Sequence, residues 1–219
     1  MILLVATRSG GKQREARRLL EPAGIEVRFP DDAGVPEDPA EDLLELGDSF
    51  ETNARAKAEY FSRRTGLPTV ADDSGLEVYA LGGAPGVRSR RWAGAVGDPR
   101  SVDEANNAEL RRRLAGAPAP RRAARYRCVL AYYSSPTAVP EIFEGSCTGR
   151  ILETPEGTGG FGYDPLFRSD ELGKSFGLAS DAEKDAVSHR GRAFRALLAR
   201  LGAGVGFGPA ASRRGEASG

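Results

Sequence analysis

The hydrophobic pattern at the start of the chain predicts a strand, a loop and a helix. Residues 2–6 are continuously apolar, which indicates a buried strand. Residues 12–20 carry apolar side chains at helical spacing, and we expect Pro22 and Gly24 to end that helix. The chain therefore begins in the manner of an α/β protein.

A second helix and a second strand are predicted after a proline-rich acidic stretch. Apolar side chains recur at helical spacing over residues 50–61, and Gly66 is expected to follow the end of this helix. Residues 69–71 then have the pattern of a short strand. That strand runs directly into Asp72 and Asp73, so we expect both aspartates at its end.

The second half of the chain adds two more helices and a pair of strands. Ser101 and Glu104 have the spacing of a capping box and predict a helix start there. Residues 125–133 and 141–149 are expected to pair as antiparallel strands, and residues 194–201 to form an amphipathic helix. Together the elements predict an α/β fold with a mixed β-sheet flanked by helices.

Length and composition indicate one domain. A chain of 219 residues, 40% of them hydrophobic, can bury one substantial core, which we expect within residues 1–201. Residues 202–219 are small, polar and glycine-rich. Such a segment buries too little apolar surface to offset the entropy of ordering, so we expect a disordered tail.

Charge and hydropathy exclude several classes of protein. The 31 basic and 31 acidic side chains balance, so no net field attracts DNA, RNA or an anionic membrane, and any polyanion must be held by a local cluster. The apolar run at residues 2–6 is too short for a signal peptide, and no later run reaches membrane-spanning length. The sequence predicts a cytoplasmic protein with neither nucleic acid nor a membrane as partner.

Thiols and imidazoles are scarce. Cys128 and Cys147 lie far apart in predicted strands and form no CxxC pair, so buried free thiols are expected, with a disulfide as the alternative. With His189 as the single histidine, a zinc site of His and Cys ligands has little to build with. A bound metal would be a hard cation held by carboxylates.

The loop between the first strand and the first helix is a candidate phosphate site. Backbone N–H groups and the helix dipole favour an anion at a helix start, and Lys12 adds a positive charge. The loop is not a P-loop, because that pattern requires glycine at Ala6 and a hydroxyl residue at Gln13. The candidate phosphate-binding residues are Thr7, Arg8, Ser9, Gly10, Gly11 and Lys12.

The adjacent carboxylates Asp72 and Asp73 are the candidate catalytic residues. Two neighbouring carboxylates repel each other unless a cation lies near them, and magnesium is the simplest such cation. Glu45 can supply a further carboxylate. Asn53 and Lys57 lie one helical turn apart and can point the same way.

A later glycine-rich segment has the features of a nucleobase pocket. Phe161 offers an aromatic platform, Gly162 permits close approach, and Asp164 can accept hydrogen bonds from the edge of a base. Lys184 and the segment 188–190, which includes the only histidine, add hydrogen-bond donors at a helix junction.

Taken together, these segments resemble the inosine triphosphate pyrophosphatase family, the Ham1-like pyrophosphatases of non-standard purine nucleoside triphosphates. The resemblance runs in order through residues 2–201, and its most specific parts are residues 49–54, 57–58, 71–76, 81–86, 160–165, 184 and 188–191. It implies an elongated, two-lobed domain with a central cleft, usually a homodimer. The implied reaction is hydrolysis of ITP, dITP or XTP at the α–β phosphate bond, giving the monophosphate and pyrophosphate.

The resemblance also implies roles for particular residues. Asp73 would bind Mg²⁺ and accept a proton, with Glu45 as the second carboxylate on the metal side, and Ser74 would touch the substrate. The loop of residues 7–12 would hold the phosphates. The positions that match nucleotide-binding residues of the family are Phe161, Gly162, Tyr163, Asp164, Lys184, His189 and Arg190. From the residue types alone, either Asp72 or Asp73 can be the base.

Two departures from the family pattern keep other hypotheses open. The family usually has asparagine where Ser9 stands and glutamate where Leu178 stands, and leucine cannot replace a carboxylate. One alternative is a Maf-like pyrophosphatase with a different base preference, which residues 161–164 and 188–190 oppose. The other is a nucleotide-binding regulatory protein without catalysis, which the retained carboxylates oppose.

Overall fold

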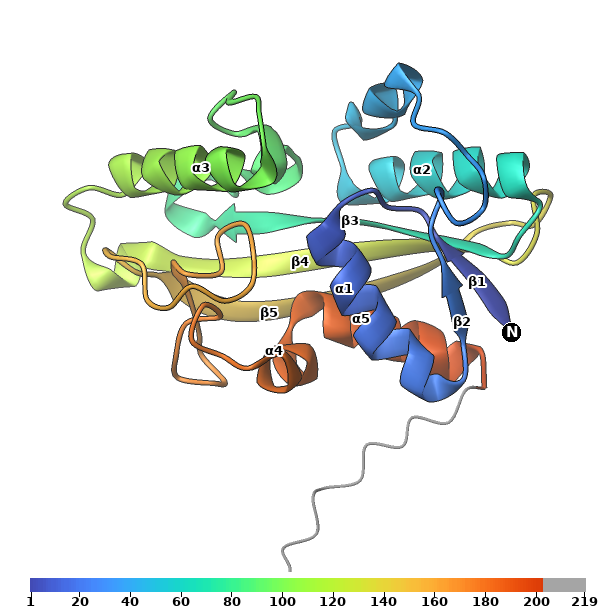
Figure 1. Ribbon diagram of the computed structural model, residues 1–219. Helices are drawn as coiled ribbons and strands as arrows, with labels where there is room; N and C mark the ends of the chain where they lie inside the picture. Colours follow the sequence, from blue (N-terminus) through green and yellow to red (C-terminus); the bar gives the residue numbers. More distant parts are fainter. Residues whose placement is uncertain (203–219) are drawn as a thin grey trace, which may run out of the picture.

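The computed structural model describes residues 1–202 as one mixed sheet with helices on both faces (Figure 1). The strands are β1 (Ile2–Val5), β2 (Glu26–Arg28), β3 (Thr69–Val78), β4 (Ala123–Tyr133), β5 (Glu141–Ile151) and β6 (Phe167–Ser169). The α-helices are α1 (Gly10–Leu20), α2 (Phe50–Thr65), α3 (Pro99–Arg113), α4 (Asp181–Val187) and α5 (His189–Arg200). Short 3₁₀ turns are η1 (Glu21–Ala23), η2 (Pro39–Glu45), η3 (Tyr79–Leu81), η4 (Gly86–Arg91) and η5 (Ala119–Arg122).

The sheet has the strand order β2-β1-β3-β4-β5-β6, with β1 parallel to both its neighbours and the remaining pairs antiparallel. Helices α1, α4 and α5 lie on one face, and α2 and α3 on the other (Figure 1). The predicted α/β fold with a mixed sheet is therefore confirmed. The tail predicted for residues 202–219 lies, beyond its first residue, outside the described part of the chain.

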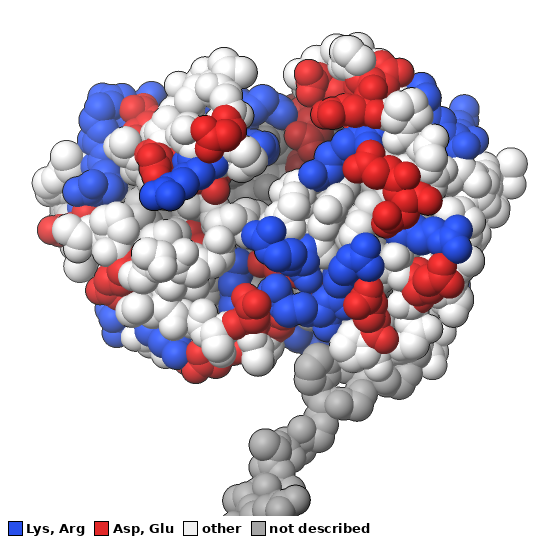
Figure 2. Space-filling model, viewed as in Figure 1, with Lys and Arg blue, Asp and Glu red and all other residues white. Residues whose placement is uncertain are grey.

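The molecule has two lobes along the length of its long strands. Helix α2 covers one end of these strands and α3 the other, on the same face, and the surface is hollowed between them (Figures 1 and 2). A separate buried cluster lies under each of the two helices. The two-lobed shape with a central cleft is therefore confirmed.

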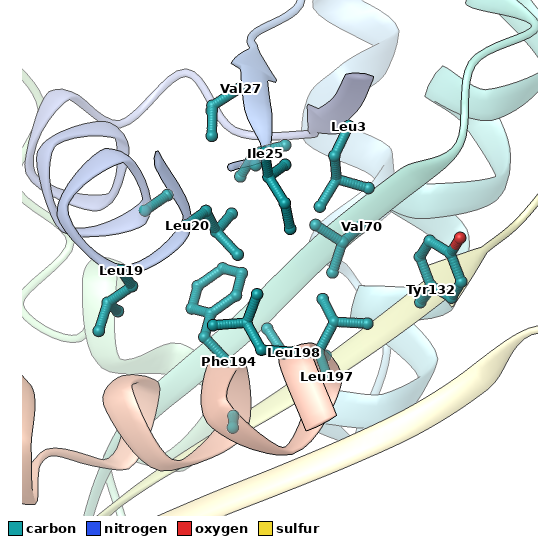
Figure 3. Close-up of a cluster of buried hydrophobic side chains, with 14 of the residues drawn as sticks. Leu3, Leu19, Leu20, Ile25, Val27, Val70, Tyr132, Phe194, Leu197 and Leu198 are labelled. Carbon is teal, nitrogen blue, oxygen red and sulfur yellow. The ribbon is translucent and has the colours of Figure 1, made fainter. Parts of the chain in front are cut away.

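A third cluster fastens α1 and α5 to the opposite face of the sheet. Leu19 and Leu20 of α1 meet Phe194 and Leu197 of α5 above Val70 of β3 (Figure 3). These side chains are almost completely buried, and each such leucine or phenylalanine contributes about 1.5–3 kcal/mol through removal of apolar surface from water. This packing fixes the starts of both helices relative to β3.

Strand β3 differs from the prediction. It extends through residues 69–78, so the expectation that Asp72 and Asp73 lie at a strand end is wrong. Pairing with β4 along its whole length keeps it extended, whereas β1 pairs only with Thr69 and Val70. The aspartates therefore lie on the stretch of β3 just beyond the end of β1, where the β1–α1 loop can approach them.

Helix α3 also begins earlier than the predicted capping box. The side chain of Asp98 accepts hydrogen bonds from the backbone N–H groups of Arg100 and Ser101, and Pro99 occupies the first helical position. Proline is preorganised for that position and has no N–H to satisfy. The prediction that Ser101 starts the helix is therefore wrong.

Both cysteines match the first of the two alternatives. Cys128 and Cys147 are buried free thiols, and burial raises the pKa of Cys147 to about 12. A thiol with so high a pKa is unreactive near neutral pH.

Within residues 1–202, every helix is too short or too polar to span a lipid bilayer.

Helix α5 packs directly on the backbone of β5 at Gly145. A Cβ atom there would overlap the carbonyl oxygen of His189 and lie 2.6 Å from the backbone nitrogen of Ala193, and neither backbone atom can turn away. We expect Gly145→Ala to lower the free energy of unfolding by about 3 kcal/mol, measured by urea denaturation. The neighbouring Ser146→Ala is the control, since Ser146 binds Arg192 through its backbone carbonyl. Equal stability of the two variants would contradict this close packing.

Candidate active site

Asp72 and Asp73 point to opposite faces of the sheet, because successive side chains of a strand alternate. Asp72 meets Lys12 of α1 and Arg190 of α5 on one face. Asp73 meets side chains of α2 on the other. The two carboxylates therefore contact different side chains, although the charges of Lys12 and Lys57 act on both.

Asp72 is held by two cations and a hydroxyl group. Its Oδ2 lies 3.1 Å from Nζ of Lys12, 3.2 Å from both Nε and Nη2 of Arg190, and 3.1 Å from Oγ of Ser74. Burial alone would raise the pKa of Asp72, but Lys12 and Arg190 outweigh burial and hold it well below its usual range. This carboxylate stays ionised and anchors the surrounding cations.

Asp73 has fewer compensating contacts. Its Oδ2 accepts a hydrogen bond of 2.9 Å from Nδ2 of Asn53, and its Oδ1 lies 3.5 Å from Nζ of Lys57. Burial raises the pKa of Asp73, and Lys57 and Lys12 offset this only in part. Asp73 therefore has the higher proton affinity of the two aspartates.

Lys57 connects Asp73 to Glu45. Its Nζ donates to Oε1 of Glu45 at 2.6 Å and to the backbone oxygen of Asp72 at 2.8 Å, while Asn53 on the same face of α2 binds Asp73. Lys57 is the main cause that lowers the pKa of Glu45 to about 2. Asn53 and Lys57 thus point together, as their spacing predicted.

The acidic side of this face suits a divalent cation that also binds substrate. Glu45 and Asp73 both face the ammonium group of Lys57, and burial, with the nearby charge of Glu45, raises the pKa of Asp73. In the described residues 1–202, no three His, Cys, Asp or Glu side chains converge as a metal cage. Mg²⁺ is commonly held by one or two carboxylates together with phosphates and water, so the predicted pair fits it chemically.

The β1–α1 loop delivers Lys12 to Asp72. Helix α1 begins at Gly10 with Ser9 as its N-cap residue, and the hydroxyl group of Ser9 makes no capping hydrogen bond within the described structure. Free N–H groups at such a helix start favour an anion. Thr7 supports the loop, since its Oγ1 accepts from the backbone nitrogen of Ser9 at 3.2 Å.

Arg8 does not join this group. Its guanidinium contacts Glu41 at 2.7 Å, Asp31, and the backbone oxygen of Val35 at 3.1 Å. It therefore fastens the chain between β2 and α2 to the β1–α1 loop. Its charge is therefore used within the fold rather than at Asp72.

Phe161, Asp164 and Lys184 form a second group beside the first. Oδ2 of Asp164 accepts hydrogen bonds from the backbone nitrogen of Phe161 at 2.8 Å and from Nζ of Lys184 at 2.5 Å. The same Nζ atom lies 4.9 Å from the ring centroid of Phe161. A Cβ atom on Gly11 would lie 2.6 Å from that ring, so the aromatic side chain rests on the predicted phosphate loop.

His189 and Tyr163 lie behind this group. The His189 ring stacks on Tyr126 with centroids 4.6 Å apart, and burial together with Arg190 holds the pKa of His189 well below its usual value, so the imidazole is neutral. The hydroxyl group of Tyr163 donates to the backbone oxygen of Ser89 at 2.7 Å. Tyr163 is buried in the core and fastens its loop to η4.

Glu15 links the two groups, and the sequence reasoning missed it. One carboxylate oxygen lies 2.7 Å from Nζ of Lys184, and the other binds Nη1 of Arg190. Arg190 and Lys184 together outweigh burial and lower the pKa of Glu15 to about 2. The available signal was its position one helical turn from both Lys12 and Leu19, on the buried face of α1.

The structure therefore brings together, around β3, a helix start with a lysine, an aromatic ring among cations, and a buried carboxylate of raised pKa. These features define an α/β enzyme for a phosphorylated substrate with an aromatic group. The chain belongs to the Ham1 family, which it matches over residues 3–200.

Individual relatives cover nearly the whole chain. It is 47% identical over 200 residues to a dITP/XTP pyrophosphatase of Ralstonia nicotianae, covering 91% of this chain and 96% of the relative. The solved structure of a HAM1 protein from Coxiella burnetii superposes with a TM-score of 0.79 at 33% identity, covering 92% of this chain and 98% of that one. A nucleoside-triphosphatase / dITP/XTP pyrophosphatase from Mycobacterium abscessus gives a TM-score of 0.69 at 43% identity, covering 90% and 99%.

The buried charge of Glu15 predicts a pH dependence of stability. Its folded-state pKa of about 2 lies below the unfolded value, so its stabilisation is present above about pH 4.5 and is lost as the pH falls toward 2. The shift corresponds to about 3 kcal/mol. We expect the free energy of unfolding of Glu15→Gln to fall less steeply than that of the wild type between pH 5 and pH 2, in urea titrations at each pH. Glu26→Gln, at an exposed site, is the control, and a Glu15→Gln slope equal to that of the wild type would rule out this role of Glu15.

Proposed function

We propose that this protein hydrolyses the non-standard purine nucleoside triphosphates ITP, dITP and XTP to the nucleoside monophosphate and pyrophosphate, and so removes them from the nucleotide pool. The names of its relatives from Ralstonia nicotianae and Mycobacterium abscessus support this substrate class. The observation that carries the proposal is Asp73, a buried carboxylate of raised pKa beside the β1–α1 loop.

Asp73 is the proposed base. Cleavage of a phosphoanhydride needs neutralised phosphates and a positioned water, without a covalent nucleophile. Asn53 holds Oδ2 of Asp73 by a hydrogen bond, whereas Oδ1 has only the longer ion pair of 3.5 Å with Lys57, so Oδ1 is the oxygen proposed to orient a water and take its proton. Asp72 is less suited to this step, because Lys12, Arg190 and Ser74 all bind its Oδ2 and favour the ionised form.

The triphosphate is proposed to lie along the start of α1. The backbone N–H groups at Gly10 and Gly11 and the ammonium group of Lys12 provide positive potential for it. Mg²⁺ held by Asp73 and Glu45 would supply further charge neutralisation on the phosphates. Ser74 lies on β3 next to Asp73 and accepts a hydrogen bond of 2.7 Å from Arg190. It is proposed to contact the substrate.

The nucleobase of the substrate is proposed to stack on Phe161, which is only partly buried. Lys184 and Arg190 lie over this ring, 4.9 Å and 5.6 Å from its centroid, and carry donors proposed for a six-position carbonyl group. Asp164 holds Lys184 by a hydrogen bond. Arg190 has five N–H donors and makes four hydrogen bonds, to Glu15, Asp72 and Ser74. Within the described residues, this count leaves one donor for substrate.

Neither departure from the family pattern removes a group that is assigned here to the chemical step. Leu178 is 54% exposed, and its backbone nitrogen binds Ser175. Ser9 keeps a hydroxyl group at the N-cap of α1, where it can donate to a phosphate. These positions favour an active enzyme over a regulatory protein without catalysis.

We further propose that the enzyme acts in the cytoplasm as a homodimer, without nucleic-acid or membrane partners.

The direct test is pyrophosphate release from ITP with magnesium, compared with ATP and with a panel of other nucleoside triphosphates. We expect rapid release from ITP, dITP and XTP and much slower release from ATP. Preference for another base would favour the Maf-like alternative. Absence of release from every nucleotide, with ITP still bound, would favour the regulatory alternative.

Asp73→Asn tests the assignment of the base. The amide cannot take a proton from water, so we expect kcat for ITP to fall by about 10³-fold while the folded structure is kept. Glu77→Gln on the same strand is the control, because Glu77 pairs with Arg125 outside this group and should leave kcat near the wild-type value. Near-normal turnover by Asp73→Asn would disprove the role of Asp73.

Selectivity between ITP and ATP separates the roles of Arg190 and Phe161. Hypoxanthine presents a carbonyl group where adenine presents an amino group, so a donor from Arg190 pairs with the first base and is left unpaired by the second. We expect Arg190→Lys, which keeps the charge beside Asp72, to lower kcat/KM for ITP about tenfold more than for ATP. Phe161→Ala should lower both values alike, by about tenfold or more, because stacking does not depend on that group. An unchanged ITP-to-ATP ratio in Arg190→Lys would remove Arg190 from selectivity.

A further inference from the structure

Helix α3 binds the peptide groups of Gly162 directly. Oδ2 of Asp103 accepts a hydrogen bond from the backbone nitrogen of Gly162 at 2.7 Å, and Nδ2 of Asn107 donates to the backbone oxygen of Gly162 at 2.9 Å. Asp103 and Asn107 are four residues apart, so they lie on one face of the helix. One glycine is thus bound through both its donor and its acceptor.

This contact completes the restraint of Phe161. On the inner side, the nitrogen of Phe161 donates to Asp164, and its carbonyl oxygen accepts from the backbone nitrogen of Asp164 at 3.3 Å. On the outer side, the next residue, Gly162, is bound by α3 and has a φ of +63°, in the left-handed region that glycine adopts without strain. The four backbone polar groups of residues 161 and 162 are therefore all engaged, which fixes the direction in which the Phe161 side chain leaves the backbone.

Helix α3 is a firm support because it is itself joined to η4. The side chain of Asn106 accepts from the backbone nitrogen of Ala93 at 2.9 Å and donates to the backbone oxygen of Arg90 at 3.0 Å. In turn, η4 is joined to β3, because Oγ of Ser89 accepts from the backbone nitrogen of Leu76 at 2.9 Å. A rigid path thus runs from the central strand through η4 and α3 to Gly162.

The Asp103 contact is partly buried. Burial raises the pKa of Asp103, and the N–H group of Gly162 counteracts this by binding the ionised form. A hydrogen bond to an ionised, partly desolvated acceptor is stronger than one between neutral groups. No residue of this contact touches Asp72, Asp73 or Glu45 in the described structure, so its contribution is separable from the proposed chemistry.

We propose that Asp103 and Asn107 are positioning residues for the nucleobase: by binding both peptide groups of Gly162, they hold the Phe161 ring in its stacking orientation. The inference rests on the proposed function, since it assigns the base to Phe161. If so, the lobe that carries α3 controls the affinity for the nucleobase, while groups on β3 and α2 carry out the chemical step.

The test compares Asp103→Ala and Asn107→Ala with the wild type in steady-state hydrolysis of ITP and ATP. We expect each variant to raise KM for both nucleotides about fivefold to tenfold, with kcat within about twofold of the wild type. Asp103→Asn keeps an oxygen acceptor for Gly162 and should restore most of the wild-type KM. Glu104→Ala is the matched control, since Glu104 lies next to Asp103 on α3, is exposed and pairs only with Arg100 among the described residues.

A double-mutant cycle separates positioning from a general structural effect. If Asp103 acts through Phe161, Asp103→Ala should change KM by less than about twofold in a Phe161→Ala background, because no ring remains to be oriented. The dissociation constant of IMP, measured by titration calorimetry, should show the same non-additivity without turnover. Full additivity, or a loss of kcat and melting temperature with unchanged KM, would overturn the proposal. Failure of the wild type to hydrolyse ITP would instead count against the proposed function.

Discussion

The structure of the site depends on one constraint, the continuation of β3 beyond the end of β1. Because β4 pairs with β3 along its whole length, the chain stays extended through Asp72 and Asp73 after its other neighbour has ended. Strand alternation then sends the two carboxylates to opposite faces. One face receives Lys12 and Arg190 from the cluster packed on α1 and α5, and the other receives Asn53 and Lys57 from α2. The different proton affinities of the two aspartates follow from this separation.

On the first face, charges of alternating sign are connected through buried side chains, in the order Asp164, Lys184, Glu15, Arg190, Asp72 and Lys12. Burying one of these charges without an oppositely charged partner would cost free energy, so each side chain depends on its neighbours to stay ionised in the interior. These contacts connect the proposed nucleobase site to the proposed phosphate-binding loop.

On the second face, the two lobes meet the site from opposite sides. The lobe under α2 supplies Asn53 and Lys57, and Arg91 of η4 crosses from the other lobe to Glu45, with Nη1 3.2 Å from Oε2. The same η4 is tied to α3, which binds the loop of Phe161. Rigid short segments, rather than the sheet itself, therefore place the parts that have to meet around a nucleotide.

The sequence by itself determined the features that are local. Helical spacing located α2 and the shared direction of Asn53 and Lys57, strand patterns located the β4–β5 pair, and the order of motifs indicated the family.

Tertiary structure decided what depends on distant partners. The length of β3 was set by its pairing with β4. The start of α3 is different, because Asp98 caps the helix through the backbone of Arg100 and Ser101, so this local signal was in the sequence and was misread there. The roles of Glu15 and Asp103 arise only when α1 meets α4 and α5, and α3 meets the Gly162 loop. Periodicity is a property of neighbouring residues, whereas the partner of a buried charge is chosen by packing between segments far apart in the chain.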